Sequence, residues 1–253
     1  MLNHPTLEKL HQLRLRGMAK AFQEQMEQPE VDGLSFMDRL ALLIDREVTE
    51  RETWHLKIRL RNAKLKQNAC VEDIDYRSPR GLDKALMLRL AGCDWIRHHN
   101  NVLLVGPTGT GKTYIACALG HKACREGFNV VYRRTPRLFA EILQAKGEGR
   151  HLKLFAALAK ADLLILDDWG LSPLDDEQRR DLLEIMDDRH INRSTLITSQ
   201  LPVENWHEMI GDGTLADAIL DRLVHNAHKI KMKGESMRKR RATAKDPLTE
   251  TRT

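Results

Sequence analysis

The stretch Val102-Leu-Leu-Val-Gly-Pro-Thr-Gly-Thr-Gly-Lys-Thr113 decides the fold of this 253-residue chain. Its first four residues are all apolar, which is typical of a buried parallel strand. The next eight match the pattern GxxxxGK(S/T), and the residues from 114 to 124 favour a helix. A chance glycine turn would not combine this pattern with a strand before it and a helix after it. The sequence therefore predicts a phosphate-binding loop (P-loop) within an α/β fold.

The residue types of this loop suit the phosphates of ATP. Its glycines allow backbone N–H groups to turn inward around an anion, and the helix that follows adds the positive end of its dipole. Lys112 is expected to reach the β- and γ-phosphates, and the Thr113 hydroxyl to hold Mg²⁺. The full set predicted to bind the nucleotide is Gly106, Pro107, Thr108, Gly109, Thr110, Gly111, Lys112 and Thr113.

A second apolar run, Leu163-Leu-Ile-Leu166, ends in two carboxylates, Asp167 and Asp168. In open parallel sheets the carboxyl ends of the strands face the ligand. We expect Asp167 to hold Mg²⁺ through water and Asp168 to orient or deprotonate the attacking water. Aspartate pairs also cap helices, but the P-loop upstream favours the metal site.

Two further runs, Val130-Val-Tyr132 and Thr195-Leu-Ile-Thr198, complete the strands predicted here. Each is short, apolar on both faces and separated from the next by enough chain for a crossover helix. The pattern predicts a parallel sheet sandwiched by helices over residues 71–236. Residues 1–70 are predicted to form a small all-helical domain for DNA or partner contact, and residues 237–253 a basic, disordered tail.

Composition restricts the remaining classes. The net charge is only +5, and no apolar run approaches the roughly eighteen residues of a membrane helix. The N-terminus lacks a signal-peptide pattern. The four cysteines show no CxxC spacing, which favours reduced thiols over a metal site or disulfides. We expect a cytoplasmic protein without membrane contact.

Positive charge is concentrated in two segments. The first carries five cations and no acid between Glu52 and Glu72; the second lies near the C-terminus and has Glu235 as its single acid. Basic helix faces can follow phosphates without reading bases, although they can also be merely solvated. We expect Lys57, Arg59, Arg61 and Lys64 to contact duplex DNA largely independently of sequence. Lys66 completes the first cluster; Lys229, Lys231, Lys233 and Arg238 to Arg241 form the second.

The P-loop, the strand ending in Asp167-Asp168, the strand ending Leu196-Ile-Thr-Ser-Gln200 and the segment Ala218-Ile-Leu-Asp-Arg-Leu223 together resemble the AAA+ ATPases. The likeness covers residues 73–241 and is greatest to the IstB transposition helpers and DnaC helicase loaders. The stretch from Leu34 to Glu47 resembles IstB in particular.

This resemblance implies further roles. Ser199, or Thr198 beside it, stands where the family has its first sensor of the γ-phosphate. Arg222 stands where the family has an arginine finger, which enters a neighbouring subunit's site, and Arg238 is a weaker candidate for a second sensor. Two departures are visible: Asp168 replaces the usual glutamate, and too few residues follow Arg222 for a full lid domain.

The resulting expectation is an ATP- and Mg²⁺-dependent ATPase that oligomerises on duplex DNA and assists a partner transposase. Its hydrolysis would be completed by a neighbouring subunit. Two alternatives stay open from the sequence: a replicative helicase loader and a P-loop kinase that acts as a monomer.

Overall fold

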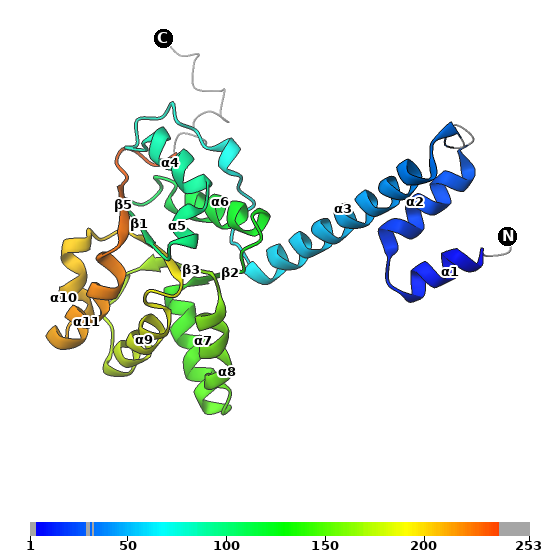
Figure 1. The fold of residues 1–253 in the computed structure, drawn as a ribbon. Helices are drawn as coiled ribbons and strands as arrows, with labels where there is room; N and C mark the ends of the chain where they lie inside the picture. Colours follow the sequence, from blue (N-terminus) through cyan, green and yellow to red (C-terminus); the bar gives the residue numbers. More distant parts are fainter. Residues whose placement is uncertain (1–3, 29–30, 32, 238–253) are drawn as a thin grey trace, which may run out of the picture. The chain divides into compact units, whose positions relative to one another are not determined.

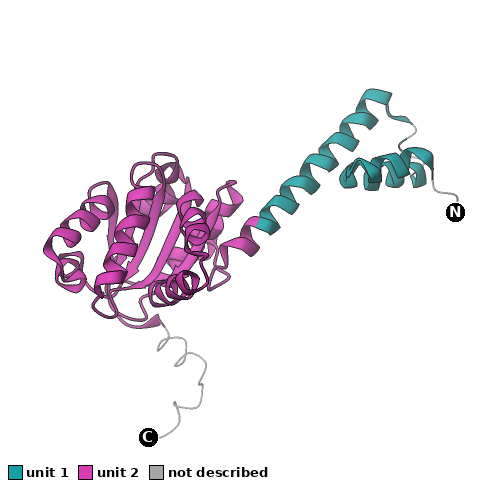
Figure 2. Cartoon of the chain, turned by 90° about the horizontal axis from the view of Figure 1, so that it is seen from below, with its two compact units in different colours: residues 1–58 teal, residues 59–253 magenta. Residues whose placement is uncertain are grey.

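A computed structural model describes residues 4–28, 31 and 33–237 of the chain. They form two compact units, residues 1–58 and 59–253 (Figure 2). The predicted domain boundary at residue 70 falls inside the second unit. The reason is that Ala63 and Ala69 are buried and Arg59 donates a hydrogen bond from Nε to the Cys124 carbonyl at 2.8 Å.

The first unit contains helices α1 (Pro5–Gln12) and α2 (Arg16–Glu27) and most of α3 (Phe36–Ala63). Helices α1 and α2 are separate, because Arg14 adopts a positive φ of 60° between them. Helix α3 begins after Ser35, whose Oγ accepts the Asp38 N–H at 3.2 Å as helix-capping serines do.

Helices α2 and α3 pack closely at Gly17. A Cβ at this position would lie 2.6 Å from the Arg46 carbonyl oxygen, so the crossing requires glycine. The buried Glu47 carboxylate accepts hydrogen bonds from the N–H groups of Gly17 at 2.7 Å and Met18 at 3.1 Å. Glu47 of α3 therefore satisfies two N–H groups in the first turn of α2, which have no partner within that helix.

The second unit is a five-stranded parallel sheet of order β2-β3-β4-β1-β5 covered by helices on both faces (Figure 1). Its strands are β1 (Asn101–Val105), β2 (Val130–Arg134), β3 (Leu163–Trp169), β4 (Ser194–Ser199) and β5 (Ala227–Lys231). The α/β prediction is confirmed, and so are the four strands predicted from apolar runs. Strand β5 was not predicted, because only Ile230 of its five residues is buried.

Helices separate the strands along the chain. Those of the second unit are α4 (Lys84–Ala91), α5 (Asp94–Arg97), α6 (Lys112–Arg125), α7 (Thr135–Gly147), α8 (His151–Lys160), α9 (Asp176–Arg189), α10 (Trp206–Ile210) and α11 (Gly213–Val224), with 3-10 turns η2 (Val71–Asp73) and η3 (Val203–Asn205). Helix α6 packs on one face of the sheet, and α7 to α11 build the core on the other. None of the described helices combines the length and apolar character of a membrane span.

Candidate nucleotide and metal site

The P-loop joins the end of β1 to the start of α6. Gly106, Gly109 and Gly111 have φ values of 150°, 85° and 97°, a region that favours glycine. The Lys112 ammonium donates to the carbonyl oxygens of Gly106 at 2.6 Å and Pro107 at 2.8 Å. Burial lowers the pKa of Lys112, and the nearby carboxylates oppose that shift. The lysine predicted to bind phosphate is thus buried within the loop, near carboxylates that favour its charged form.

Three other segments brace this loop. Thr108 Oγ1 donates to Gln200 Oε1 at 2.6 Å, and Arg80 Nη1 donates to the Thr110 carbonyl at 3.2 Å. The N–H of Met237 donates to the Gly109 carbonyl at 2.9 Å. The loop is therefore held from outside as well as by its own helix.

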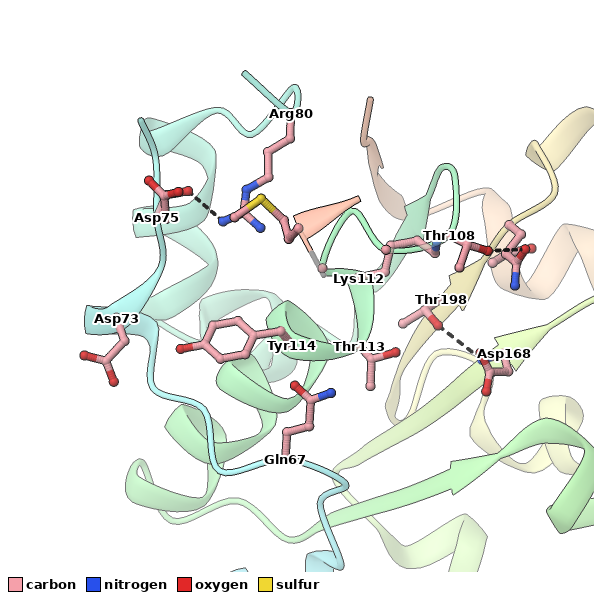
Figure 3. A pocket seen from close by; sticks show the side chains of 15 residues that line it. Gln67, Asp73, Asp75, Arg80, Thr108, Lys112, Thr113, Tyr114, Asp168 and Thr198 are labelled. Carbon is pink, nitrogen blue, oxygen red and sulfur yellow. Dashed lines mark hydrogen bonds between the residues drawn. The ribbon is translucent and has the colours of Figure 1, made fainter. Parts of the chain in front are cut away.

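A cavity of about 210 Å³ opens beside the P-loop. Figure 3 shows side chains of the segment before β1, including Gln67 and Arg80, on one side of it, and Thr198 and Asp168 on the other. Its lining combines loop, linker and strand-end residues: Gln67, Asp73, Asp75, Arg80, Thr108, Gly109, Gly111, Lys112, Thr113, Tyr114, Asp168, Thr198, Ser199, Gln200 and Met237.

Asp167 is the best-connected carboxylate of the site. It is fully buried, and its Oδ1 accepts from Thr113 Oγ1 at 2.9 Å and Thr198 Oγ1 at 2.6 Å. Its Oδ2 accepts from the Tyr132 hydroxyl at 2.5 Å. Burial and Asp167 together raise the pKa of Tyr132, so this hydroxyl remains a proton donor. Charge-assisted hydrogen bonds of this kind hold a buried carboxylate in one orientation.

Asp168 points differently although it is the next residue. Its φ of 61° and a register shift between β3 and β4 turn its side chain toward the cavity. The Arg134 guanidinium donates from Nε to Asp168 Oδ2 at 2.7 Å, and the Thr198 hydroxyl accepts the Asp168 N–H at 3.2 Å (Figure 3). Asp168 therefore faces the cavity while paired with an arginine of its own chain.

The oxygen atoms present suit Mg²⁺. This ion prefers hard oxygen ligands and is commonly held by one or two carboxylates together with substrate phosphates. Thr113 Oγ1 and Asp167 Oδ1 are such oxygens, and they meet at 2.9 Å beside the P-loop. The two residues predicted to hold the metal are thus brought together from α6 and β3.

The two sensor candidates differ in their contacts. Ser199 Oγ donates to the Trp169 carbonyl at 2.9 Å and accepts the Leu201 N–H at 3.0 Å, so its hydroxyl stabilises the turn after β4. Thr198 Oγ1 instead donates to the Asp167 carboxylate at 2.6 Å and accepts the backbone N–H of Asp168 at 3.2 Å. Of the two neighbouring residues, Thr198 is the one whose hydroxyl lies at the acidic pair.

Arg222 lies outside this cavity. It is near the end of α11, where its backbone carbonyl accepts from Asn101 Nδ2 at 3.0 Å. Asn101 is the first residue of β1, whereas the P-loop follows the last residue of β1. Arg222 therefore lies at the amino ends of the strands, opposite the P-loop at their carboxyl ends. Its side chain forms an ion pair with Asp187 of α9. Arg238, the weaker sensor candidate, lies outside the described residues.

The predicted DNA-contacting cations have separate surroundings. Lys57, Arg61 and Lys64 are exposed, whereas Arg59 is partly buried against Cys124. Helix α3 ends at Ala63, and Lys64 has a φ of 51°, so it does not continue the helical face on which it was predicted. Lys66, included in the same basic cluster from the sequence, forms ion pairs with Asp167 and Asp168 instead.

Sequence reasoning missed Lys66, Tyr132, Arg134 and Arg80 as residues of this site. A signal existed for Tyr132, which ends the predicted strand Val130–Tyr132, whereas Arg134 lies two residues beyond that prediction and ends the observed strand β2. Their strand pairs with β3 so that Arg134 lies opposite Asp167. Lys66 and Arg80 come from the segment between α3 and β1. This segment contains no predicted strand, so the sequence did not show which part of the sheet it contacts.

Comparison with known proteins places this chain in a family. The family described as IstB-like ATP binding protein matches residues 8–245. An insertion sequence ATP-binding protein of Sinorhizobium fredii, y4pL, is 56% identical over 94% of this chain and 98% of its own length. The IS21 ATP-binding protein of Pseudomonas aeruginosa is 32% identical over 96% of this chain and 92% of its own.

Solved structures agree on the fold. The DnaC helicase loader matches with a TM-score of 0.54 and 21% identity, over 68% of this chain and all of that chain. DnaA of Aquifex aeolicus bound to AMPPCP matches with a TM-score of 0.56 and 14% identity, over 75% of this chain and 58% of that one. These likenesses establish an AAA+ fold, and the extent of the family match establishes that the chain belongs to the IstB-like ATP-binding proteins.

Proposed function

We propose that the chain is a Mg²⁺-dependent ATPase that binds duplex DNA and assists a transposase. The observation that carries the proposal is the contact between Thr113 Oγ1 and Asp167 Oδ1 at 2.9 Å, beside the Lys112 ammonium. A lysine ammonium for the phosphates and two oxygen ligands for the metal thereby lie together, supplied by one loop and one strand end.

Each residue has a distinct part in this proposal. Lys112 leaves the loop carbonyls and binds the β- and γ-phosphates, while Thr113 and Asp167 hold Mg²⁺. The metal, when bound, offsets the negative charge that develops on the phosphates. Asp168 accepts a proton from the attacking water, for which it must loosen its pair with Arg134. That requirement and the short side chain of Asp168 favour slow hydrolysis.

Completion of the site by a neighbouring copy is the second part of the proposal. Arg222 lies at the end of the strands away from its own P-loop and is not among the residues lining the cavity. An arginine finger that acts between subunits must lie away from its own site, so this position is compatible with the role. Arginine fingers contribute roughly 10³- to 10⁵-fold in rate in other phosphoryl-transfer enzymes.

Mixing two inactive variants tests the shared site. Arg222→Ala protein keeps an intact P-loop, and Lys112→Ala protein keeps an intact finger. A mixed oligomer should therefore recover ATPase activity that neither variant has alone. If no ratio restores hydrolysis although light scattering shows mixed oligomers, the finger assignment is wrong.

DNA binding and the transposition partner form the third part. The relatives named above are insertion sequence ATP-binding proteins, which supports a role beside a transposase. Lys57, Arg61 and Lys64 are exposed cations of the first basic cluster without an ion pair to the acidic site and could neutralise backbone phosphates. Contacts of this kind position a protein on DNA without specifying a sequence.

A salt titration of DNA binding, with and without ATP, tests this part. For duplex DNA the log–log salt slope is about −0.9 per phosphate neutralised. Replacing Lys57, Arg61 and Lys64 by alanine should flatten the slope by up to about three units per subunit while ATP binding is unchanged. Unchanged affinity and slope would assign these cations to a solvated surface only.

A helicase loader is the remaining alternative, because the DnaC fold matches over 68% of this chain. At 21% identity that likeness concerns the fold alone. Pull-down with the transposase and with the replicative helicase of the host separates the two. ATP-dependent capture of the helicase but not the transposase would favour the loader.

A further inference from the structure

Lys66 provides the positive charge nearest to the buried carboxylate of the metal site. Its Nζ lies 3.5 Å from Asp167 Oδ2 and 4.0 Å from Asp168 Oδ2. Within the described part of the chain, no other lysine or arginine forms an ion pair with Asp167. The Lys112 ammonium contacts the carbonyl groups of its own loop instead. The direct ion pair of Asp167 therefore comes from the segment after α3, whereas Lys112 of the P-loop acts on it only at longer range.

The segment that carries Lys66 is firmly packed on α6. Ala63 and Ala69 at its two ends are buried. Leu65 lies so close to Gly120 that a Cβ there would be 3.0 Å from Leu65 Cδ2. The N–H groups of Lys66 and Gln67 contact the Cys117 thiol, whose pKa burial raises. Lys66 therefore extends from a fixed backbone, and its side chain, 37% exposed, reaches the acidic pair from there.

Two cations cannot share these carboxylates without cost. A buried charge needs a counter-charge, and Asp167 is fully buried. Before Mg²⁺ binds, Lys66 supplies that counter-charge. A divalent ion held by Thr113 and Asp167 would add two positive charges a few ångströms from the Lys66 ammonium. Electrostatic repulsion then favours a position of Lys66 away from the pair.

We propose that Lys66 is the resident counter-ion of the metal site: it pairs with Asp167 in the metal-free chain, while Arg134 pairs with Asp168, and it leaves Asp167 when Mg²⁺ and nucleotide bind. Lys66 thereby sets how strongly nucleotide binding depends on Mg²⁺. The inference rests on the proposed nucleotide site. It differs from a phosphate-binding role, in which Lys66 would stabilise nucleotide equally with and without the metal.

Lys66→Met removes the charge and keeps most of the side chain's length. Lys153→Met is the matched control, because Lys153 is an exposed lysine on α8 of the same unit. A fluorescent ATP analogue is titrated into each protein in EDTA and in saturating Mg²⁺. For a partly exposed ion pair we expect roughly tenfold weaker binding of Lys66→Met in EDTA and no loss in Mg²⁺. The Mg²⁺ concentration at half-maximal binding should fall by about the same factor.

A second measurement uses Mg²⁺ without nucleotide. Loss of Lys66 leaves the acidic pair without this counter-charge, so Mg²⁺ alone should raise the melting temperature of Lys66→Met more than that of wild type or Lys153→Met. Lys66→Arg, which keeps the charge, should behave like wild type in both assays and covers the case in which the methionine variant does not fold.

The outcomes separate cleanly. An unchanged ratio of affinities in EDTA and Mg²⁺, or an equal loss in both, would overturn the counter-ion role. So would equal stabilisation of all variants by Mg²⁺. If wild type bound no nucleotide, the proposed ATPase function would fail, and the stabilisation by Mg²⁺ alone would still decide the role of Lys66.

Discussion

Replacing Tyr132 by phenylalanine removes one hydroxyl from the contacts around Asp167 and leaves the ring in place. The hydroxyl donates to Asp167 Oδ2 at 2.5 Å, and both residues are buried. Without it, the Lys66 ammonium at 3.5 Å is the partner that Oδ2 keeps among the described residues. A hydrogen bond to a charged group contributes about 1.5–3 kcal/mol, and a buried acceptor left unsatisfied incurs its desolvation cost.

A loss of about 2 kcal/mol should lower the melting temperature by about 4–8 °C, since 1 kcal/mol corresponds to roughly 2–4 °C for a domain of 150–250 residues. Differential scanning fluorimetry measures it, and the transition that Mg²⁺–ATP shifts identifies the unit with the P-loop. Tyr76→Phe is the control: the Tyr76 ring lies by Lys84, and its hydroxyl bonds to no other described residue. If Tyr132→Phe melts within about 1 °C of Tyr76→Phe, the bond to Asp167 does not stabilise the fold as reasoned here.

Three other substitutions test separate parts of the molecule. Lys112→Ala should abolish tight ATP binding in a fluorescent-nucleotide titration, because a charge-assisted contact to the phosphates is lost. Asp168→Asn should bind ATP normally and hydrolyse it more slowly in a phosphate-release assay, because Asp167 and Thr113 remain while proton acceptance is lost. Glu47→Gln should make the free energy of unfolding of the first unit less dependent on pH at acid pH. Burial raises the pKa of the Glu47 carboxyl, but hydrogen bonds from Arg51, Met18 and Gly17 outweigh it and hold that pKa below its ordinary value of 4.5. This carboxylate therefore stabilises the fold above about pH 4.5, and its contribution is lost as pH falls through the lower, folded-state pKa.

Each of these expectations has a contrary result. Wild-type affinity in Lys112→Ala would mean that nucleotide binds elsewhere. Wild-type turnover in Asp168→Asn would exclude Asp168 as the proton acceptor. Chemical unfolding of Glu47→Gln between pH 3 and 7, followed by helical circular dichroism, should differ from wild type mainly at neutral pH. An identical pH dependence in both proteins would show that the contacts of Glu47 with α2 do not stabilise this unit.

The sequence by itself determined the P-loop, the strand before it and the strand that ends at Asp167. Phosphate binding needs several consecutive backbone N–H groups and one lysine, so the whole phosphate-binding loop lies in eight neighbouring residues. Strands buried on both faces are apolar throughout, and four were therefore visible without a partner. The contact of Thr113 with Asp167 also followed, because parallel strands end at one edge of a sheet.

Only the tertiary structure decided the roles of polar and charged side chains distant in sequence. Strand β5 escaped notice because an edge strand needs little apolar surface, and backbone pairing with β1 defines it. The sequence favours Ser199 over its neighbour Thr198, yet Ser199 stabilises a turn while Thr198 contacts Asp167. Lys66 belongs to a basic cluster by composition, but by position it pairs with Asp167 and Asp168. The role of a charged side chain depends on the groups that it contacts. Packing between segments distant in sequence determines these contacts, and local sequence patterns do not encode that packing.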